Sequence, residues 1–506
     1  MKHNYLFTFS ICCALFLSFS FNLNAQIPGQ SEFDGSGNDY IEYIHGNLPI
    51  IISAPHGGTI TSGSLPNRSC GTNEPDDNTA ILIRAIQDEI FAQTGGYAHV
   101  IINNLNRRKL DPNREVSEAT CSSNTDANDT TEALYYWNAW HSFIDDASTS
   151  VEANYGKGLY IDLHGQSHTV PRIEIGYRIS RADLINTTPN HLNTVSGSTI
   201  TSLVGNNINN HTQEELVRGS NSLGALFHNA PGTYYAGQNY PGCGRNGTNG
   251  YRATPSNFNG GSGNCNDTAP NNSNYFSGFY YNNERHGSGP TASDGQGGGG
   301  TIDGIMTEVN RRVRDVGTTL EPFAIDYANV VLNYINIHYN DFAVFNYDAA
   351  MYDITDSDPT PTLTGVTGGQ FSSTGGLSID PNTGVIDTSN SITGVYIVTY
   401  DVGPNQYFST TQNVEIVDGT LSLNDIEKEN QIVIYPNPTQ DVLHYKASKN
   451  VYKIVVFNAL GQVVDTQIFN QKSGIINMTK YSTGLYLTKF YDNTGKRVLT
   501  KQILKR

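Results

Sequence analysis

Nearly continuous apolar runs alternate with longer amphipathic stretches over about residues 39–347 of this chain. The runs PIIISA, YAHVIINNL, GLYIDL and GIMTEV are typical of buried strands. Residues 78–93, 131–147 and 321–340 carry apolar residues at helical spacing instead. Strands that alternate with helices predict an α/β domain over residues 39–347.

The helix expected over 78–93 has recognisable ends. Asp77 is a possible N-cap, and Gly95 and Gly96 are expected to end the helix. Its core-facing stripe is predicted to comprise Ile81, Ile83, Ile86, Ile90 and Phe91. In the other two helices the aromatic residues are expected in the core rather than at a cofactor: Tyr135, Trp137, Trp140, Phe143, Phe323, Tyr327 and Tyr334.

Helical spacing disappears after about residue 353. Residues 353–417 consist of short alternating runs with closely spaced turn residues, which predicts a small all-β sandwich. The phrase GGQFSSTGGLSIDPNTGVID looks like that of immunoglobulin-like modules in secreted bacterial proteins, for which a spacer role is expected. A polar linker at 418–430 precedes a second alternating, turn-rich segment at 431–506, for which another β-sandwich is expected.

Residues 220–300 are rich in Gly, Asn, Ser and Tyr. A loop of this length inside a domain is usually functional or disordered. Two interpretations stay open: a lid over the substrate that a disulfide ties down, and an elaborated surface loop.

The first 25 residues have the pattern of a signal peptide. A weakly basic start is followed by the apolar run 6–21, and Leu23-Asn24-Ala25 is a plausible cleavage site. The alternative is a membrane anchor, but the run is short for a bilayer, and no later stretch is apolar enough to cross one. We therefore expect removal of residues 1–25 and an oxidising destination.

The cysteines that remain after cleavage are even in number: Cys70, Cys121, Cys243 and Cys265. Three pairings are possible, and we favour Cys70–Cys121 with Cys243–Cys265 because each bridge then stays within one segment. A thiolate zinc site is disfavoured because no Cys-x-x-Cys spacing occurs.

Length and charge narrow the class of protein. A chain of 506 residues is expected to form about three domains. The formal net charge of −17 argues against nucleic acid or an anionic membrane as a partner, because both require a basic surface.

Histidines and carboxylates stand where the apolar runs end. His56 follows PIIISAP, Asp162 and His164 follow GLYI, and Glu308 follows GIMT. Chemistry gathers at the carboxyl ends of strands in open α/β sheets, and His with carboxylate ligands is typical of a catalytic zinc site. Two histidines at equivalent strand ends, each before a glycine, favour metal binding over a structural role.

The third ligand is expected to be a carboxylate from NEPDDNTA, which contains Glu74, Asp76 and Asp77. Asp76 is favoured because Asp77 suits the helix cap. Asp162 is expected to orient the imidazole of His164 by accepting a hydrogen bond from it.

Glu308 is the candidate general base, which accepts a proton from water and returns it to the leaving amine. Its alternative role is a salt bridge to Arg311 or Arg312. In NRRKLDPNR, Arg107 and Arg114 suit a bidentate clamp on a substrate carboxylate, with Asp111 holding one of them. A purely structural ion-pair cluster is the alternative.

The motifs PHGG, D-x-x-T, R-x-x-x-D-x-N-R, DLHG and TEVNR follow one another over about residues 45–340. This series resembles the N-formylglutamate amidohydrolases, zinc hydrolases whose fold is similar to that of zinc carboxypeptidases. The resemblance implies a carboxypeptidase-like mixed sheet flanked by helices, with His56, Asp76 and His164 as Zn²⁺ ligands. It also implies two groups on the substrate side. The substrate-side motif comprises Arg107, Asp111, Asn113 and Arg114. A late turn with Arg285 and His286 would contact the substrate or stabilise an oxyanion.

The C-terminal blocks YPNP, LGQ and GLY, with a basic tail around Lys496 and Lys501, resemble the sorting domain of the type IX secretion system of Bacteroidetes. The resemblance implies export through the periplasm by that machinery to the cell surface or beyond, usually with removal of this domain. The signal peptide and the even number of cysteines agree with this. An exported enzyme does not fit intracellular histidine breakdown, so the chemistry of the amidohydrolases can carry over without their substrate.

The sequence therefore predicts a secreted zinc-dependent amidohydrolase that acts on an N-acyl, and in one version N-formyl, amino acid or peptide. One alternative is a surface binding protein or adhesin that has kept the fold and lost catalysis. Another is a carboxypeptidase-type peptidase that acts on peptides or peptidoglycan fragments.

Overall fold

The computed structural model describes residues 27–121, 132–230, 250–261, 265–270, 274–419, 432–495 and 497–506. The expected signal peptide and Lys496 lie outside these residues. The chain divides into two compact units. The first reaches Asn346 and also takes in Thr362–Ser372 and Thr399–Thr411; the second comprises Tyr347–Pro361, Ser373–Val398 and Gln412–Arg506.

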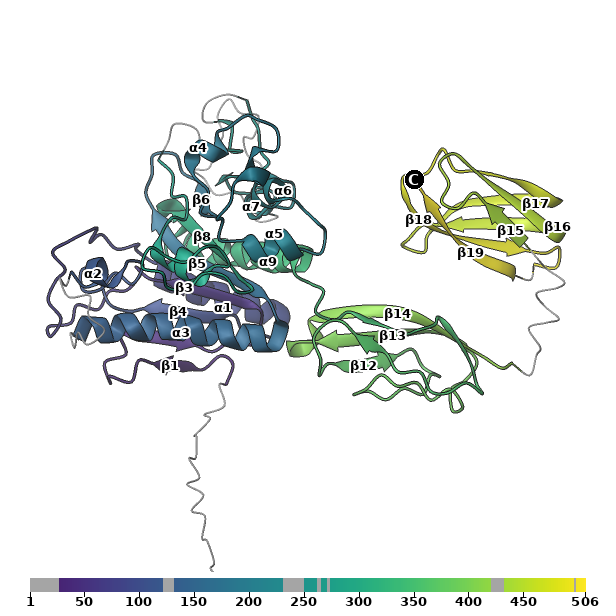
Figure 1. Ribbon diagram of the computed structural model, residues 1–506, viewed down its shortest axis with the longest axis horizontal. Coiled ribbons are helices and arrows are strands. Elements are labelled where there is room, and N and C mark those ends of the chain that lie inside the picture. Colours follow the sequence, from purple (N-terminus) through teal and green to yellow (C-terminus); the bar gives the residue numbers. More distant parts are fainter. Residues whose placement is uncertain are drawn as a thin grey trace, which may run out of the picture. The chain divides into compact units, whose positions relative to one another are not determined.

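An eight-stranded mixed sheet forms the centre of the first unit, with strand order β1-β2-β4-β3-β5-β8-β6-β7 (Figure 1). The four central strands β4, β3, β5 and β8 are parallel, whereas β2 and β6 run antiparallel to their neighbours β4 and β8. The mixed α/β fold is thus confirmed. The bounds are β1 Ser31–Phe33, β2 Ile41–Ile44, β3 Ile50–Ala54, β4 His99–Asn103, β5 Gly158–Gln166, β6 Ile173–Gly176, β7 Ala253–Thr254 and β8 Ile302–Asn310.

Helices cover both faces of this sheet. Ile51 of β3 and Tyr160 of β5 join the aromatic face of α3 (Glu132–Tyr155) in one hydrophobic cluster. On the opposite face, Thr307 of β8 bonds to Tyr327 of α9 (Leu320–His338), which packs against α1 (Thr79–Thr94). Shorter helices complete the unit: α2 Val116–Ala119, α4 Arg181–Leu184, α5 Thr201–Asn206, α6 Gln213–Arg218, α7 Leu223–His228 and α8 Tyr281–His286.

Helix α1 differs in detail from its prediction. Ile81 and Phe91 are 48% and 41% exposed, and Leu82 takes the place of Ile81 on the buried stripe. The N-cap is Asn78, in the left-handed region at φ 67°, and no side chain caps the helix, so the predicted Asp77 cap is wrong. The Asn78 side chain instead donates to the carbonyl of Arg314. Gly95 ends the helix in the left-handed region, as predicted.

Most of the aromatic residues assigned to the core of α3 and α9 are buried. Tyr135 is the exception at 48% exposed, because its ring lies at the outer edge of α3, where its hydroxyl reaches the carbonyl of Asp34.

Residues 220–300 are packed into the domain in part, while the described residues 293–297 are exposed. Tyr251 and Asp267 are buried, and α8 packs against β5 and β8. Phe276 and Tyr280 border the cavity described below. The Cys70–Cys121 disulfide is present as predicted, whereas Cys243 of the second expected pair lies outside the described residues.

The rest of the described chain is all-β, as predicted. One four-stranded sheet has the order β10-β14-β13-β12, and β9 pairs with β11. The last five strands are hydrogen-bonded around a single core, and the long strand β16 pairs with three neighbours. Bounds are β9 Phe345–Asn346, β10 Met351–Asp353, β11 Thr362–Leu363, β12 Gln370–Ser373, β13 Gly394–Val402, β14 Phe408–Val417, β15 Ile432–Tyr435, β16 Val442–Phe457, β17 Val463–Asn477, β18 Gly484–Tyr491 and β19 Arg497–Lys505.

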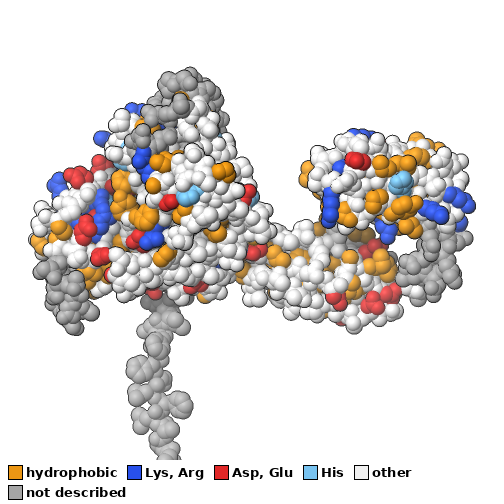
Figure 2. All heavy atoms as spheres, turned by 45° about the horizontal axis from the view of Figure 1, so that its top comes forward, with side chains coloured by type: hydrophobic (Ala, Val, Ile, Leu, Met, Phe, Trp, Pro, Cys, Tyr) orange, Lys and Arg blue, Asp and Glu red, His pale blue; other side chains and the backbone are white. Residues whose placement is uncertain are grey.

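Among the described residues, no helix combines the length and apolar character needed to cross a bilayer. Figure 2 shows acidic and basic side chains interspersed on the visible face of the α/β part.

Candidate metal centre

Three chain segments meet at the carboxyl ends of β3 and β5. His56 follows β3 by two residues, and His164 lies near the end of the neighbouring parallel strand β5. Asp76 reaches them from the loop before α1, where its backbone N–H donates to the carbonyl of His56 at 3.0 Å. Gly57 permits this approach, because a Cβ at that position would lie 2.3 Å from the backbone nitrogen of Ala80.

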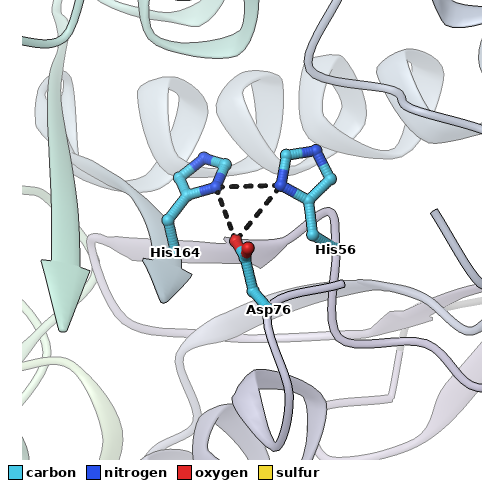
Figure 3. A group of neighbouring side chains, drawn as sticks. All are labelled: His56, Asp76 and His164. Atoms are coloured by element: carbon cyan, nitrogen blue, oxygen red, sulfur yellow. Dashed lines mark hydrogen bonds and ion pairs between the residues drawn. The ribbon is translucent and has the colours of Figure 1, made fainter. Parts of the chain in front are cut away.

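The donor atoms of His56, Asp76 and His164 converge (Figure 3). The two Nδ1 atoms are 3.1 Å apart, and Oδ2 of Asp76 lies 3.2 Å from the first and 3.1 Å from the second. All three residues are buried, and their ligand atoms lie within 4.8 Å of one another. This group could hold a metal ion. Glu74 and Asp77, the other candidates for the third ligand, are exposed.

A buried carboxylate fixes the orientation of each imidazole. Nε2 of His56 lies 2.7 Å from Oδ1 of Asp111, and Nε2 of His164 lies 2.7 Å from Oδ2 of Asp162. An ionised carboxylate only accepts hydrogen bonds, so each Nε2 carries the proton. When the imidazoles are neutral, both Nδ1 atoms then present lone pairs toward Asp76.

Lone pairs from two imidazoles and one carboxylate repel one another unless a cation or a proton lies between them. Burial alone would raise the pKa of Asp76, but the positive charge that His56 and His164 carry when protonated, together with their hydrogen bonds, holds it well below its usual range, so the carboxylate is ionised. A bound cation would take the place of those protons. Two neutral imidazoles and an anionic oxygen with Nδ1 aimed inward are suited to a divalent ion such as Zn²⁺. The residues present therefore fit the metal that the sequence predicts.

Asp111 connects the centre to the basic segment after β4. Its Oδ2 accepts from Nε of Arg107 at 3.0 Å while Oδ1 holds His56, and Arg68 lies 3.8 Å away. Burial opposes ionisation of Asp111, but His56 and Arg107 lower its pKa below the usual range. The structure therefore places Asp111 against both a predicted ligand and a predicted clamp residue.

Glu308 lies beside the centre, directly opposite His164 in the register of β5 and β8. It is buried, and within the described residues its Oε2 has no hydrogen-bond partner. Arg311 and Arg312, the alternative partners that the sequence offered for Glu308, are exposed. Burial raises the pKa of Glu308 to about 8, against the lowering effect of His164.

Asn113 and α8 support the second histidine. Nδ2 of Asn113 lies 3.0 Å from Nε2 of His164, but Nε2 donates its hydrogen bond to the closer, charged Asp162. Oδ1 of Asn113 accepts from the backbone of Asn282, whose side chain donates to Asp162 at 3.2 Å. Asn282 escaped the sequence analysis because its segment gave no sign of contact with β5.

A cavity of about 240 Å³ opens onto His56, Asp76 and His164. Asn113, Arg107 and Arg114 line it, and Arg114 also lies over the ring of Tyr280, 5.2 Å from its centroid. Further lining residues that the sequence did not single out are Thr72, Gln166, His168, Phe276 and Tyr280.

Arg285 and His286 are placed elsewhere. His286 is buried between His141 and Asp145 of α3, at 2.9 Å and 3.1 Å, and Arg285 lies over Trp137. Neither borders the cavity among the described residues. Both pack α8 against α3 instead.

Comparisons with known proteins agree with the C-terminal prediction. A family model described as a secretion system C-terminal sorting domain matches residues 433–506. This confirms the predicted sorting domain and indicates export, with the chain secreted or at the cell surface.

Similarity to solved structures is distant. An N-formylglutamate amidohydrolase from Ralstonia eutropha JMP134 aligns at 10% identity and a TM-score of 0.29, over 58% of this chain and 95% of its own length. The BSP domain of a biofilm associated protein aligns at 19% identity and a TM-score of 0.13, over 32% of this chain and 29% of that protein. Dimeric latent PorU from Porphyromonas gingivalis aligns at 11% identity and a TM-score of 0.13, over 32% and 18%. No curated protein matches the chain.

Proposed function

We propose that this exported protein is a zinc-dependent hydrolase, with a carboxypeptidase-like catalytic domain, that cleaves the amide bond of an N-acyl amino acid or small peptide. The observation that carries the proposal is the convergence of two Nδ1 atoms and an Asp76 oxygen beside Glu308, whose buried Oε2 has no hydrogen-bond partner in the described part of the chain. A purely structural cluster gains nothing from leaving a buried carboxylate oxygen unsatisfied.

His56, Asp76 and His164 would hold Zn²⁺, which when bound lowers the pKa of water and polarises a carbonyl. Asp111 and Asp162 keep both imidazoles oriented and make them stronger donors. Glu308, next to His164 across the strand pair, is the group suited to accept a proton from the attacking water. Its raised pKa favours a group that takes up and releases protons near neutral pH.

The cavity supports a small acyl or amino-acid group as the part of the substrate that enters. Its volume of about 240 Å³ is below the range of about 300–1,000 Å³ usual for drug-sized ligands. Arg107 is already engaged by Asp111, whereas Nη2 of Arg114 is not committed to Glu118 or to the Asn113 carbonyl. Arg114 is therefore the better candidate to grip a substrate carboxylate.

Two measurements test the proposal on the mature protein. Elemental analysis should find one zinc per chain, and His164→Ala should remove it. A panel of N-formyl and N-acetyl amino acids, dipeptides and peptidoglycan fragments should include a substrate whose hydrolysis stops with a chelator and returns with Zn²⁺.

The panel also separates the alternatives. Hydrolysis of C-terminal peptide bonds alone would identify a carboxypeptidase-type peptidase. A protein without zinc that hydrolyses no member of the panel but binds glycans or cell surfaces would be an adhesin, and the proposed function would be wrong.

A further inference from the structure

A second histidine–carboxylate pair borders the cavity beyond the metal centre. Nδ1 of His168 lies 3.0 Å from Oε1 of Glu174, which is fully buried on β6. Since the carboxylate accepts, Nδ1 carries a proton in either charge state, and Nε2 is the nitrogen that gains or loses the second proton. Within the described residues Nε2 has no protein partner, and the His168 side chain is 21% exposed at the cavity.

The surroundings hold this ring in one orientation. Phe276 stacks on His168 with centroids 4.9 Å apart and planes 12° from parallel. Gln166 accepts from the backbone N–H of His168 at 2.6 Å, and the backbone of Phe276 donates to Oε2 of Glu174 at 2.9 Å. Arg172 lies 3.5 Å from the same carboxylate. A ring whose orientation is fixed by several contacts is suited to a catalytic group, which must meet the reacting atom at a defined position.

The sheet places this pair next to the candidate base. Glu174 of β6 is directly opposite Glu308 of β8, and Glu308 is directly opposite His164 of β5. Opposed residues share one face of a sheet, with Cβ atoms about 4.5–5.5 Å apart. His164, Glu308 and Glu174 therefore form one row, with His168 attached at its end.

We propose that His168 is a catalytic residue that donates the proton to the leaving amine, and that Glu174 is its positioning residue. This inference rests on the proposed function. Glu308 is buried beside the centre, whereas His168 is partly exposed where the product leaves and can be protonated again from solvent. These positions suit Glu308 as the group that accepts a proton from water and His168 as the group that donates a proton to the amine.

The proton balance is complete. Glu308 takes one proton from the water whose oxygen bonds to the amide carbon. Nε2 of the His168 imidazolium gives its proton to the nitrogen as the C–N bond breaks, so that an amine and a carboxylic acid are formed. The proton on Glu308 then passes through solvent back to His168, and both groups return to their starting states.

The leaving group provides the test, because an amine requires a proton and p-nitrophenolate does not. For His168→Gln, kcat on an amide substrate should fall at least about 100-fold, while kcat on the p-nitrophenyl ester of the same acid stays within about fivefold. Glu174→Gln should lower the amide rate selectively as well. Glu284→Gln, which removes a carboxylate paired with Arg178 outside the cavity, is the matched control.

Zinc content and the far-UV spectrum of each variant establish that the fold and the centre are intact. Equal losses on amide and ester, or no loss on the amide, would overturn the role of His168 while leaving the hydrolase in place. A wild-type protein that cleaves neither substrate would overturn the proposed function, and this inference with it.

Discussion

The Nδ1 atoms of His56 and His164 lie 3.1 Å apart, although His56 follows β3 and His164 lies in β5. Each ring is turned by its own carboxylate, Asp111 or Asp162, so that the unprotonated nitrogen faces its counterpart. Two unprotonated imidazole nitrogens do not approach this closely without a cation or a shared proton between them, and here the ionised Asp76 lies against both. The pair is thus organised around a site for a cation, and Asp76 supplies the negative charge.

The carboxylates behind the histidines should tune metal affinity. Asp162→Asn keeps the shape of the side chain but accepts more weakly from Nε2 of His164, so zinc affinity should fall about 10- to 100-fold. Competition with a chromophoric chelator measures this. Asp145→Asn is the matched control, since Asp145 holds His286 at 3.1 Å in the same way, away from the cavity. Unchanged affinity in Asp162→Asn would contradict the assignment.

Replacement of the candidate base Glu308 should slow the chemical step without changing zinc binding. Glu308→Gln retains volume but no longer accepts a proton, so kcat should fall about 10²- to 10⁴-fold with zinc content unchanged. Steady-state kinetics and elemental analysis on the same preparation check both statements. If kcat changes less than threefold, another group acts as the base.

Arg114 should select substrates that carry a carboxylate. Charge-assisted hydrogen bonds contribute about 1.5–3 kcal/mol, so Arg114→Gln should raise KM roughly 10- to 100-fold for such substrates. Arg114→Lys should restore only part of the loss, because an ammonium lacks the planar fork. For a substrate amidated at that carboxyl group, Arg114→Gln should leave KM unchanged. Arg108→Gln, at an exposed arginine of the same segment, serves as the control.

Asp303 should make stability depend on pH. Burial raises its pKa from 3.8 to about 6, with bonds from Ser288 and Tyr339 opposing the rise. Between these values the folded state binds more protons than the unfolded state, so stability falls by about 3 kcal/mol as pH rises through this window. Asp303→Asn should remove the dependence.

Urea unfolding from pH 4 to pH 8, followed by the fluorescence of Trp137 and Trp140 in α3, measures this stability. Asp341→Asn, which removes a partly exposed partner of Lys157, is the control and should leave the slope intact. A slope that persists in Asp303→Asn would assign the dependence to another group.

The choice among the candidate acids shows the limit of local pattern. Glu74, Asp76 and Asp77 are nearly adjacent, and the preference for Asp76 rested on an Asp77 helix cap that does not form. Asp76 alone of the three is buried, because the chain after Gly57 packs onto the start of α1. Asp76 thus lies at the metal centre because its loop packs onto the start of α1, and not because Asp77 caps the helix.

By itself the sequence determined the four central strands β3, β4, β5 and β8 and the histidines that follow or end two of them. Burial on both faces leaves each of these strands as a continuous apolar run that can be recognised in the sequence. The sequence also determined the sorting domain, whose motifs are contiguous. Only the tertiary structure decided that Asp111 orients His56 and that Glu174 lies opposite Glu308. Those contacts depend on the lateral order of strands, in which the antiparallel β6 lies beside β8, and lateral order is set by packing between distant segments.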